Sequence, residues 1–176
     1  AKGKGKIYYW WQSEGVSKDG KVKEEDKFLR VRRSFYDRYG RMLSGTSFKQ
    51  NDLVVVKVSL QSSYSSVIEN VVVTDLLPAG FEIENPRIKE VQVMQWVKDA
   101  STPQYMDIRD DRIFFFANAQ SKAQNFYYVV RAVTPGNFKL GPASVNAMYN
   151  GDYHSYHGGG DVRITTKRNN AVASNP

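Results

Sequence analysis

The chain has 176 residues, of which 41% are hydrophobic, a length that fits one large domain or one domain with extensions. Its formal charge is +7, and the absence of cysteine excludes disulfides, thiolate nucleophiles and cysteine-ligated zinc within the chain. No apolar run approaches the roughly 20 residues of a membrane-spanning helix. The start at Ala1 shows no signal-peptide pattern, so we expect any targeting signal to lie upstream.

The N-terminal quarter is rich in both aromatic and basic residues. Residues 7–12 read as a first strand with aromatic side chains on both faces, and residues 13–26 as a polar loop. Lysines on an exposed strand edge discourage pairing with other sheets, so we interpret the basic residues as a solvated edge rather than a nucleic-acid site. The basic residues concerned are Lys2, Lys4, Lys6, Lys18, Lys21, Lys23, Lys27, Arg30, Arg32 and Arg33.

The next part of the chain predicts strands separated by turns. A strand from Phe28 to about Tyr36 ends in a turn over residues 37–40. The clearest strand covers residues 53–61, where one face is uniformly apolar and is expected to face the core: Val54, Val56, Val58 and Leu60. Residues 71–75 form a further strand that stops before Pro78 and Gly80, and residues 81–83 resume an extended segment.

The C-terminal half continues in the same way. Residues 88–98 are ambiguous: their β-branched content favours a strand, with a short helix as the alternative near Pro86. Residues 105–109 and 112–117 predict a hairpin, and later strands are expected at 125–133, 138–140, 143–149 and 161–165. Short strands with frequent turns, and no sustained helical periodicity, predict an all-β antiparallel sandwich with immunoglobulin-like connections. The polar residues 167–176 are expected to fray.

Few residues suggest chemistry. His154 and His157 lack the further ligands of a zinc site, and the glycines that follow them favour a mobile loop. Asp107, Asp110 and Asp111 lack the spacing of a calcium loop and fit a turn. No Gly-x-Ser-x-Gly motif occurs. The sequence therefore nominates no catalytic, cofactor-binding or metal-binding residue, and it predicts a domain that is not an enzyme.

Four stretches together carry a family resemblance. They are residues 28–37 with Gly40; residues 51–56; residues 72–86, which read VVTDLLPAGFEIENP; and residues 127–138, which read YYVVRAVTPGNF, running on to 142–143 and 148–149. This combination resembles the C-terminal macroglobulin-like domain of the bacterial alpha-2-macroglobulin family. The resemblance implies a macroglobulin-like β-sandwich over residues 28–166, with residues 1–27 as an N-terminal strand and loop at a possible junction with a preceding domain.

The resemblance also implies a function. It suggests an interaction and shielding domain of a periplasmic or cell-envelope protease inhibitor, a protease trap that engages its target proteases as a full-length protein. The domain is expected to pack on the preceding helical domain, which in many members carries a thioester. No nucleic acid or cofactor is implied, and membrane attachment is expected only through an anchor outside this chain.

Within this resemblance, Met148 and Tyr149 match the segment that faces the reactive bond, so they are the candidate interdomain contacts. The alternative is that they alternate in and out of an ordinary strand, one of them in the core. The signature residues Asp75, Pro78 and Gly80 read as a strand exit, and Arg131 is expected to pair with a carboxylate beside the sheet.

Two rival functions remain open from sequence. The exposed tyrosines and tryptophans suggest a free-standing adhesion or carbohydrate-binding sandwich, which requires a continuous aromatic platform. A hydrolase is the third hypothesis, for which no nucleophile with a neighbouring base is evident.

Overall fold

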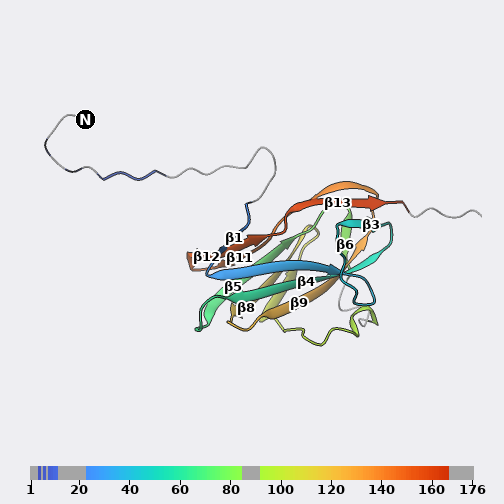
Figure 1. Cartoon of the computed structure of the whole chain (residues 1–176), viewed down its shortest axis with the longest axis horizontal. Coiled ribbons are helices and arrows are strands. Elements are labelled where there is room, and N and C mark those ends of the chain that lie inside the picture. Colours follow the sequence, from blue (N-terminus) through green and yellow to red (C-terminus); the bar gives the residue numbers. More distant parts are fainter. Residues whose placement is uncertain (1–3, 5, 7, 12–22, 85–91, 167–176) are drawn as a thin grey trace, which may run out of the picture.

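A computed structural model of the chain describes residues 4, 6, 8–11, 23–84 and 92–166, and within these ranges it contains β-strands and one 3-10 turn but no α-helix (Figure 1). No helix in the described part is long and apolar enough to cross a membrane. The elements are β1 (Glu25–Lys27), β2 (Leu29–Tyr36), β3 (Ser47–Lys49), β4 (Leu53–Ser62), β5 (Ile68–Leu76), β6 (Phe81–Ile83), η1 (Gln92–Met94), β7 (Tyr105–Ile108), β8 (Arg112–Ala119), β9 (Gln124–Ala132), β10 (Gly136–Leu140), β11 (Ala143–Ala147), β12 (Asn150–His157) and β13 (Gly160–Thr165).

The strands form two main sheets and one small one. The larger sheet has the order β1-β12-β11-β5-β8-β7, the second has the order β2-β4-β9-β6, and the small sheet has the order β10-β13-β3. Neighbours are antiparallel except β3 and β13, which are parallel. The expected antiparallel β-sandwich is therefore confirmed.

The core lies between the two main sheets. On β4 the four positions expected to face inward, Val54, Val56, Val58 and Leu60, are all buried. Across the sandwich, the rings of Phe115 on β8 and Phe126 on β9 stack with centroids 5.0 Å apart. Burying aromatic side chains of this size contributes much of the stability of a two-layer domain.

A segment after residue 91 crosses the outer face of the β2-β4-β9 sheet. Its 3-10 turn corrects the strand expected at 88–98 for the part that is described; residues 85–91 lie outside the described ranges. Trp96 packs on Tyr36 of β2 and on Tyr127 of β9, with ring centroids 5.2 and 6.1 Å apart. Val55, on the outward face of β4 and paired with Tyr36, is also buried.

The N-terminal region differs from the sequence expectation. Tyr8, Tyr9, Trp10 and Trp11 are not in a strand, which corrects the strand expected at 7–12 for its described residues. An isolated strand has no partner for its backbone groups and does not hold its shape in water. Conversely, Glu25 and Asp26, expected in the loop over residues 13–26, belong to the edge strand β1, which pairs with β12. The expected tail at 167–176 lies outside the described residues.

Candidate functional site

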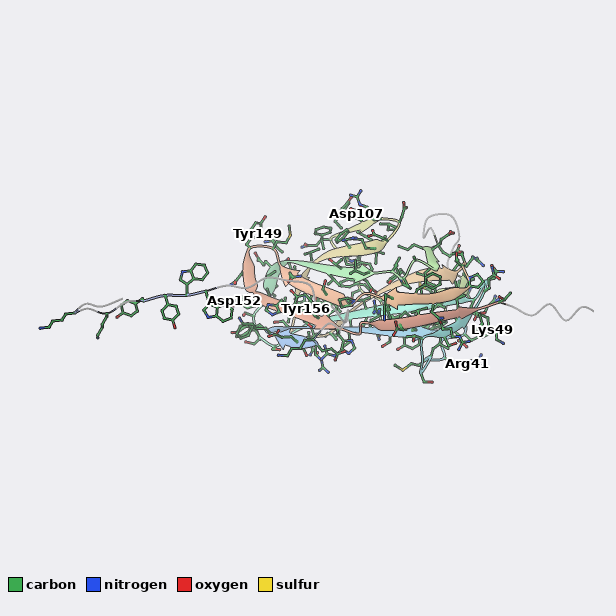
Figure 2. The ribbon with its side chains drawn as sticks, turned by 90° about the horizontal axis from the view of Figure 1, so that it is seen from above. Arg41, Lys49, Asp107, Tyr149, Asp152 and Tyr156 are labelled. Carbon is green, nitrogen blue, oxygen red and sulfur yellow. The ribbon has the colours of Figure 1, made fainter. Side chains whose placement is uncertain are left out.

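The tight turn between β11 and β12 carries the two residues singled out by sequence. Met148 and Tyr149 lie in this turn rather than in a strand, and neither is in the core, so the alternative of an in-and-out strand pair is wrong. Met148 is 52% exposed and Tyr149 is 84% exposed. Figure 2 shows Tyr149 at one end of the sandwich, opposite the end that carries Arg41 and Lys49.

The turn is fixed to the sheet beside it. The Met148 backbone N–H donates a hydrogen bond of 2.9 Å to the carbonyl of Asn70, at the start of β5. Asn70 itself has a positive φ of 55° within an irregularity of the β5–β8 ladder, and its N–H is bonded to Oδ1 of Asn118 at 3.0 Å. Irregular ladder positions can re-aim neighbouring side chains. The exposed pair is therefore presented by an ordered backbone.

An aromatic cluster closes the sandwich where the chain crosses between the sheets. The Phe28 ring stacks on Tyr64 with centroids 5.1 Å apart and lies 5.0 Å from the Tyr153 ring. Phe28 joins β1 to β2, and Tyr64 lies in the connection from β4 to β5, so both belong to crossings between sheets. Phe28 has a φ of 66°, which is unusual for a large side chain. The cluster thus covers the core at these crossings with aromatic side chains that are partly exposed.

A buried polar network joins the two main sheets. Arg33 of β2 forms an ion pair with Asp75 of β5, and it also donates to the carbonyls of Gly141, at 2.8 Å, and Gly158. The Tyr128 hydroxyl donates to the other Asp75 oxygen at 2.7 Å. Burial raises the pKa of Asp75, while the Arg33 guanidinium and the Tyr128 hydroxyl oppose that shift. Among the described residues, no buried side-chain nitrogen or oxygen of this network lacks a hydrogen-bond partner, so Asp75 ties the sheets together in addition to ending its strand.

Arg131 has the partner that the sequence predicted. Its Nε lies 2.5 Å from Oε1 of Glu84, just beyond β6. Because β6 and β9 are neighbours in the sheet, this pair holds the end of β6 in place.

The two histidines lie in the ordered strand β12, which corrects the expected mobile loop. Residues three apart on a strand point to opposite faces, so His154 and His157 cannot converge on one metal ion. The His157 Nε2 lies 3.6 Å from Glu24, and its Nδ1 is buried with no hydrogen-bond partner among the described residues. Burial lowers the pKa of His157, opposed by the Glu24 carboxylate.

The three aspartates of the other candidate site belong to the β7–β8 hairpin: Asp110 and Asp111 form its turn, as expected, whereas Asp107 lies in strand β7. Asp107 pairs with Arg109 at 2.8 Å, and Asp111 pairs with Arg112 at 2.6 Å. The Arg109 N–H donates to the Arg112 carbonyl across the turn at 2.9 Å. Within the described ranges, no three His, Asp or Glu side chains gather closely enough to hold a metal ion.

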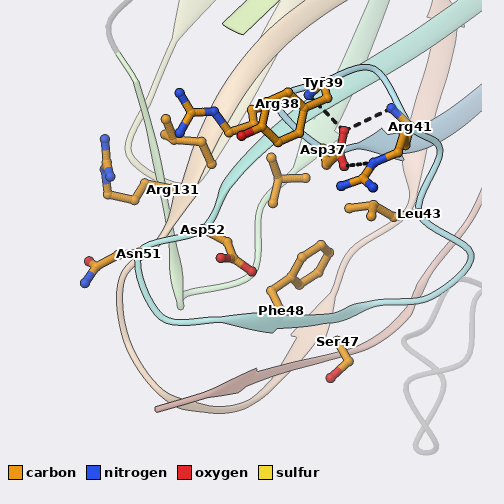
Figure 3. A pocket seen from close by; sticks show the side chains of 12 residues that line it. Asp37, Arg38, Tyr39, Arg41, Leu43, Ser47, Phe48, Asn51, Asp52 and Arg131 are labelled. Carbon is orange, nitrogen blue, oxygen red and sulfur yellow. Dashed lines mark hydrogen bonds and ion pairs between the residues drawn. The ribbon is translucent and has the colours of Figure 1, made fainter. Parts of the chain in front are cut away.

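A hollow of about 420 Å³ is lined in part by Asp37, Arg41 and Arg131 (Figure 3). It lies at the end of the sandwich that carries Arg41, opposite Tyr149 (Figure 2). Its wall includes the turn after β2, where Asp37 accepts hydrogen bonds from the N–H groups of Tyr39 and Arg41 and from Nε of Arg41. Arg131, on another wall, is already paired with Glu84. These carboxylates and guanidinium groups therefore satisfy one another. Sequence reasoning gave no signal for this hollow.

Comparison with known proteins gives one consistent family. The family model described as "Bacterial Alpha-2-macroglobulin MG10 domain" matches residues 29–152. The alpha-2-macroglobulin of Xylella fastidiosa (strain Temecula1 / ATCC 700964) is 30% identical over 156 residues, which cover 81% of this chain and 9% of the relative. The alpha-2-macroglobulin of Escherichia coli K12 is 31% identical over 134 residues, covering 69% of this chain and 8% of the relative.

Solved structures agree. The crystal structure of Salmonella alpha-2-macroglobulin reacted with methylamine matches with a TM-score of 0.70 and 28% identity, over 82% of this chain and 10% of that one. The native conformation of E. coli alpha-2-macroglobulin matches with a TM-score of 0.73 at 21% identity, again over 82% and 10%, and shows the shared fold. The chain thus spans about a tenth of the length of these relatives.

Proposed function

This chain belongs to the bacterial alpha-2-macroglobulin MG10 domain family, and from that premise we propose that it is the interaction and shielding domain of a bacterial protease inhibitor. In this proposal the domain packs on the preceding helical domain of the same parent chain. The full-length parent, rather than this domain, engages the target proteases. The domain itself catalyses no reaction.

One observation carries the proposal: an exposed apolar pair is held on a fixed turn. Met148 and Tyr149 contribute little to the core of their own domain, yet the Met148 N–H is anchored to the carbonyl of Asn70. A contiguous exposed apolar patch on an ordered surface is typical of a site that another protein surface covers, whereas a single exposed apolar residue is not. A flexible thioether beside a flat ring can fill an irregular hydrophobic recess.

The chemistry of a relative supports our proposal for what this contact shields. The Salmonella protein was studied after reaction with methylamine. An amine is a nucleophile, and an electrophile such as a thioester survives in water only where solvent and amines are kept out. This chain contains no cysteine, so in our proposal the reactive bond lies in the neighbouring domain and this turn covers it.

The proposal includes a location in the periplasm or the cell envelope. It rests on the resemblance to the bacterial family, and it assigns any membrane attachment to an anchor outside this chain. Fractionation of cells that produce the full-length parent tests it, and recovery of the parent from the cytoplasm would contradict it.

The shielding role is tested in the full-length parent with Tyr149→Ser. We expect faster inactivation by methylamine and weaker capture of protease. The matched control is Tyr39→Ser, which removes an exposed tyrosine from the opposite end of the sandwich. If deletion of the whole domain changes neither property, the shielding role is wrong.

A further inference from the structure

The ladder between β5 and β8 contains one extra residue close to the turn that follows β11. Two residues of β5, Glu69 and Asn70, lie between successive ladder pairs where β8 supplies only Asn118. This arrangement is a β-bulge, which increases the local twist of a strand and changes the direction of the groups at that position. The bulge therefore sets the direction of the backbone near the start of β5.

Two asparagines specify the conformation of this bulge. Asn70 has a φ of 55°, in the left-handed region that asparagine adopts more readily than most other residues. Its N–H donates a hydrogen bond of 3.0 Å to Oδ1 of Asn118. A bulge leaves one residue without its partner in the ladder. Here the side-chain oxygen of Asn118 takes the place of the missing backbone acceptor, so the conformation depends on the identity of both residues.

The bulge is joined directly to the turn between β11 and β12. The ladder between β5 and β11 ends where Val71 lies opposite Ala147. One residue further on, the Met148 N–H donates a hydrogen bond of 2.9 Å to the carbonyl of Asn70. Two hydrogen bonds in series therefore connect the Asn118 side chain to the backbone of the turn.

These contacts lie outside the hydrophobic core. Asn70 is exposed and Asn118 is half-buried. Met148 and Tyr149, at the other end of the connection, are both exposed. The two hydrogen bonds are therefore not needed to close the core, and their effect is on the geometry of the turn.

We propose that Asn70 and Asn118 are positioning residues, which hold the turn in the conformation that presents Met148 and Tyr149 to the helical domain. The consequence for shielding rests on the proposed function, whereas the ordering of the turn is a property of the isolated chain. An ordered turn loses less conformational entropy on contact than a mobile one. It also keeps a reactive bond covered, because reagents reach a covered site in proportion to the fraction of molecules in which the cover is open.

Exchange of the Met148 amide hydrogen in the isolated chain, measured by NMR, tests the ordering of the turn. Asn118→Leu removes the accepting oxygen, and Asn118→Asp keeps it. We expect Asn118→Leu to raise the exchange rate about fivefold or more, as for the loss of one hydrogen bond, and Asn118→Asp to match the wild type. The control is Gln61→Leu, which removes a side-chain hydrogen bond of 2.8 Å to the Ser121 carbonyl. An unchanged Met148 rate in Asn118→Leu would overturn the proposal.

Asn70 provides a second pair of variants, which does not depend on the folding of Asn118→Leu. Alanine is strained at a φ of 55°, and glycine is not. We therefore expect faster Met148 exchange in Asn70→Ala and a rate close to the wild type in Asn70→Gly. The amide of Val73, a buried residue of the same strand, should exchange at the wild-type rate in both variants. Equal Met148 rates in the two variants would contradict the role of the bulge.

Inactivation of the full-length parent by methylamine tests the consequence for shielding. We expect Asn118→Leu to speed inactivation by about the factor by which it speeds Met148 exchange, and Asn118→Asp to leave the rate unchanged. Faster inactivation of Tyr149→Ser but not of Asn118→Leu would overturn the positioning role. No effect of either variant would contradict the proposed function instead, and Met148 exchange in the isolated chain would still decide whether the asparagines position the turn.

Discussion

The guanidinium of Arg33 and the carboxylate of Asp75 form an ion pair between the two main sheets, with side-chain exposures of 2% and 0%. Arg33 comes from β2 and Asp75 from β5, so the pair joins strands that share no backbone ladder. The Tyr128 hydroxyl donates a hydrogen bond to the second carboxylate oxygen of Asp75. A buried pair of this kind is costly to break, because removing one member leaves the other charged and without water.

We therefore expect Arg33→Met to lower the free energy of unfolding by about 3–5 kcal/mol. The matched control is Arg32→Met, one residue along the same strand, whose partner Asp26 is partly exposed. Exposed pairs contribute about 0–1 kcal/mol, so the control should change little. Urea unfolding of the isolated chain measures both.

The loss of stability caused by Arg33→Met should depend on pH. Burial raises the pKa of Asp75, and without Arg33 the main opposing charge is gone. A carboxyl with a raised pKa binds more protons in the folded state than in the unfolded state, so its contribution to stability falls as the pH rises. The loss caused by Arg33→Met should therefore be smaller at pH 5 than at pH 8. Equal losses for Arg33→Met and Arg32→Met would contradict the role assigned to the buried pair.

His157 should make the domain less stable in mild acid. Burial lowers its pKa below the ordinary 6.5. The unfolded chain then binds more protons than the folded one as the pH falls below 6.5, so stability is present above that pH and is lost on acidification. Unfolding measured at pH 7.5 and 5.5 should show this loss, and His157→Gln should reduce it. A variant that keeps the full wild-type loss would count against the assignment.

Gly40 occupies a position where any other residue would be strained. Its φ is +84°, and a Cβ there would lie 2.6 Å from Cδ2 of the Trp96 ring. Gly40→Ala should destabilise the domain by about 1–3 kcal/mol through backbone strain and displacement of Trp96. Gly45→Ala is the control, since a Cβ at Gly45 meets nothing within 4 Å. Thermal unfolding compares the two, and similar melting temperatures would refute the close contact.

The Asp99 side chain holds the segment after residue 91 against the outer face of the β2-β4-β9 sheet. Its carboxylate accepts hydrogen bonds from Lys57 at 2.8 Å, from Tyr127 at 2.7 Å and from Asn125 at 2.8 Å. Asp99→Ala should release this segment and expose Trp96, at a cost of about 1 kcal/mol in stability. With Trp10 and Trp11 replaced by phenylalanine, the emission of the remaining tryptophan in this chain should shift to the red.

The control for this release is Asp110→Ala, in the exposed turn of the β7–β8 hairpin. It should leave the emission unchanged. An unchanged spectrum for Asp99→Ala as well would show that Trp96 is held without the carboxylate.

The architecture was predictable where the side-chain pattern has a period of two. The inward face of β4 and the β7–β8 hairpin follow directly from alternation and turn residues, and both are confirmed. Val55 shows the limit of this reasoning. Val55 is buried beside Tyr36, on which Trp96 of a distant segment packs, and a pattern within one strand contains no information about such a cover.

Other differences between the expected and the observed strands have similar causes. β12 was missed because its sequence is polar and ends at glycines, yet β11 and β1 pair with it on both sides. β3 has three residues and pairs in parallel with β13, so its formation depends on a long-range contact. For the candidate site, the position of Met148 and Tyr149 came from resemblance, and the tight turn that exposes both is a result of the structure.

Oxidative footprinting of Met148 and Tyr149 tests the central claim most directly, because it compares the accessibility of both side chains in the isolated chain and in the full-length parent. Our account predicts that both react readily in the isolated chain and are strongly protected in the parent, while Tyr39 reacts similarly in both. Reaction of Met148 and Tyr149 in the parent at the rate seen in the isolated chain would contradict it.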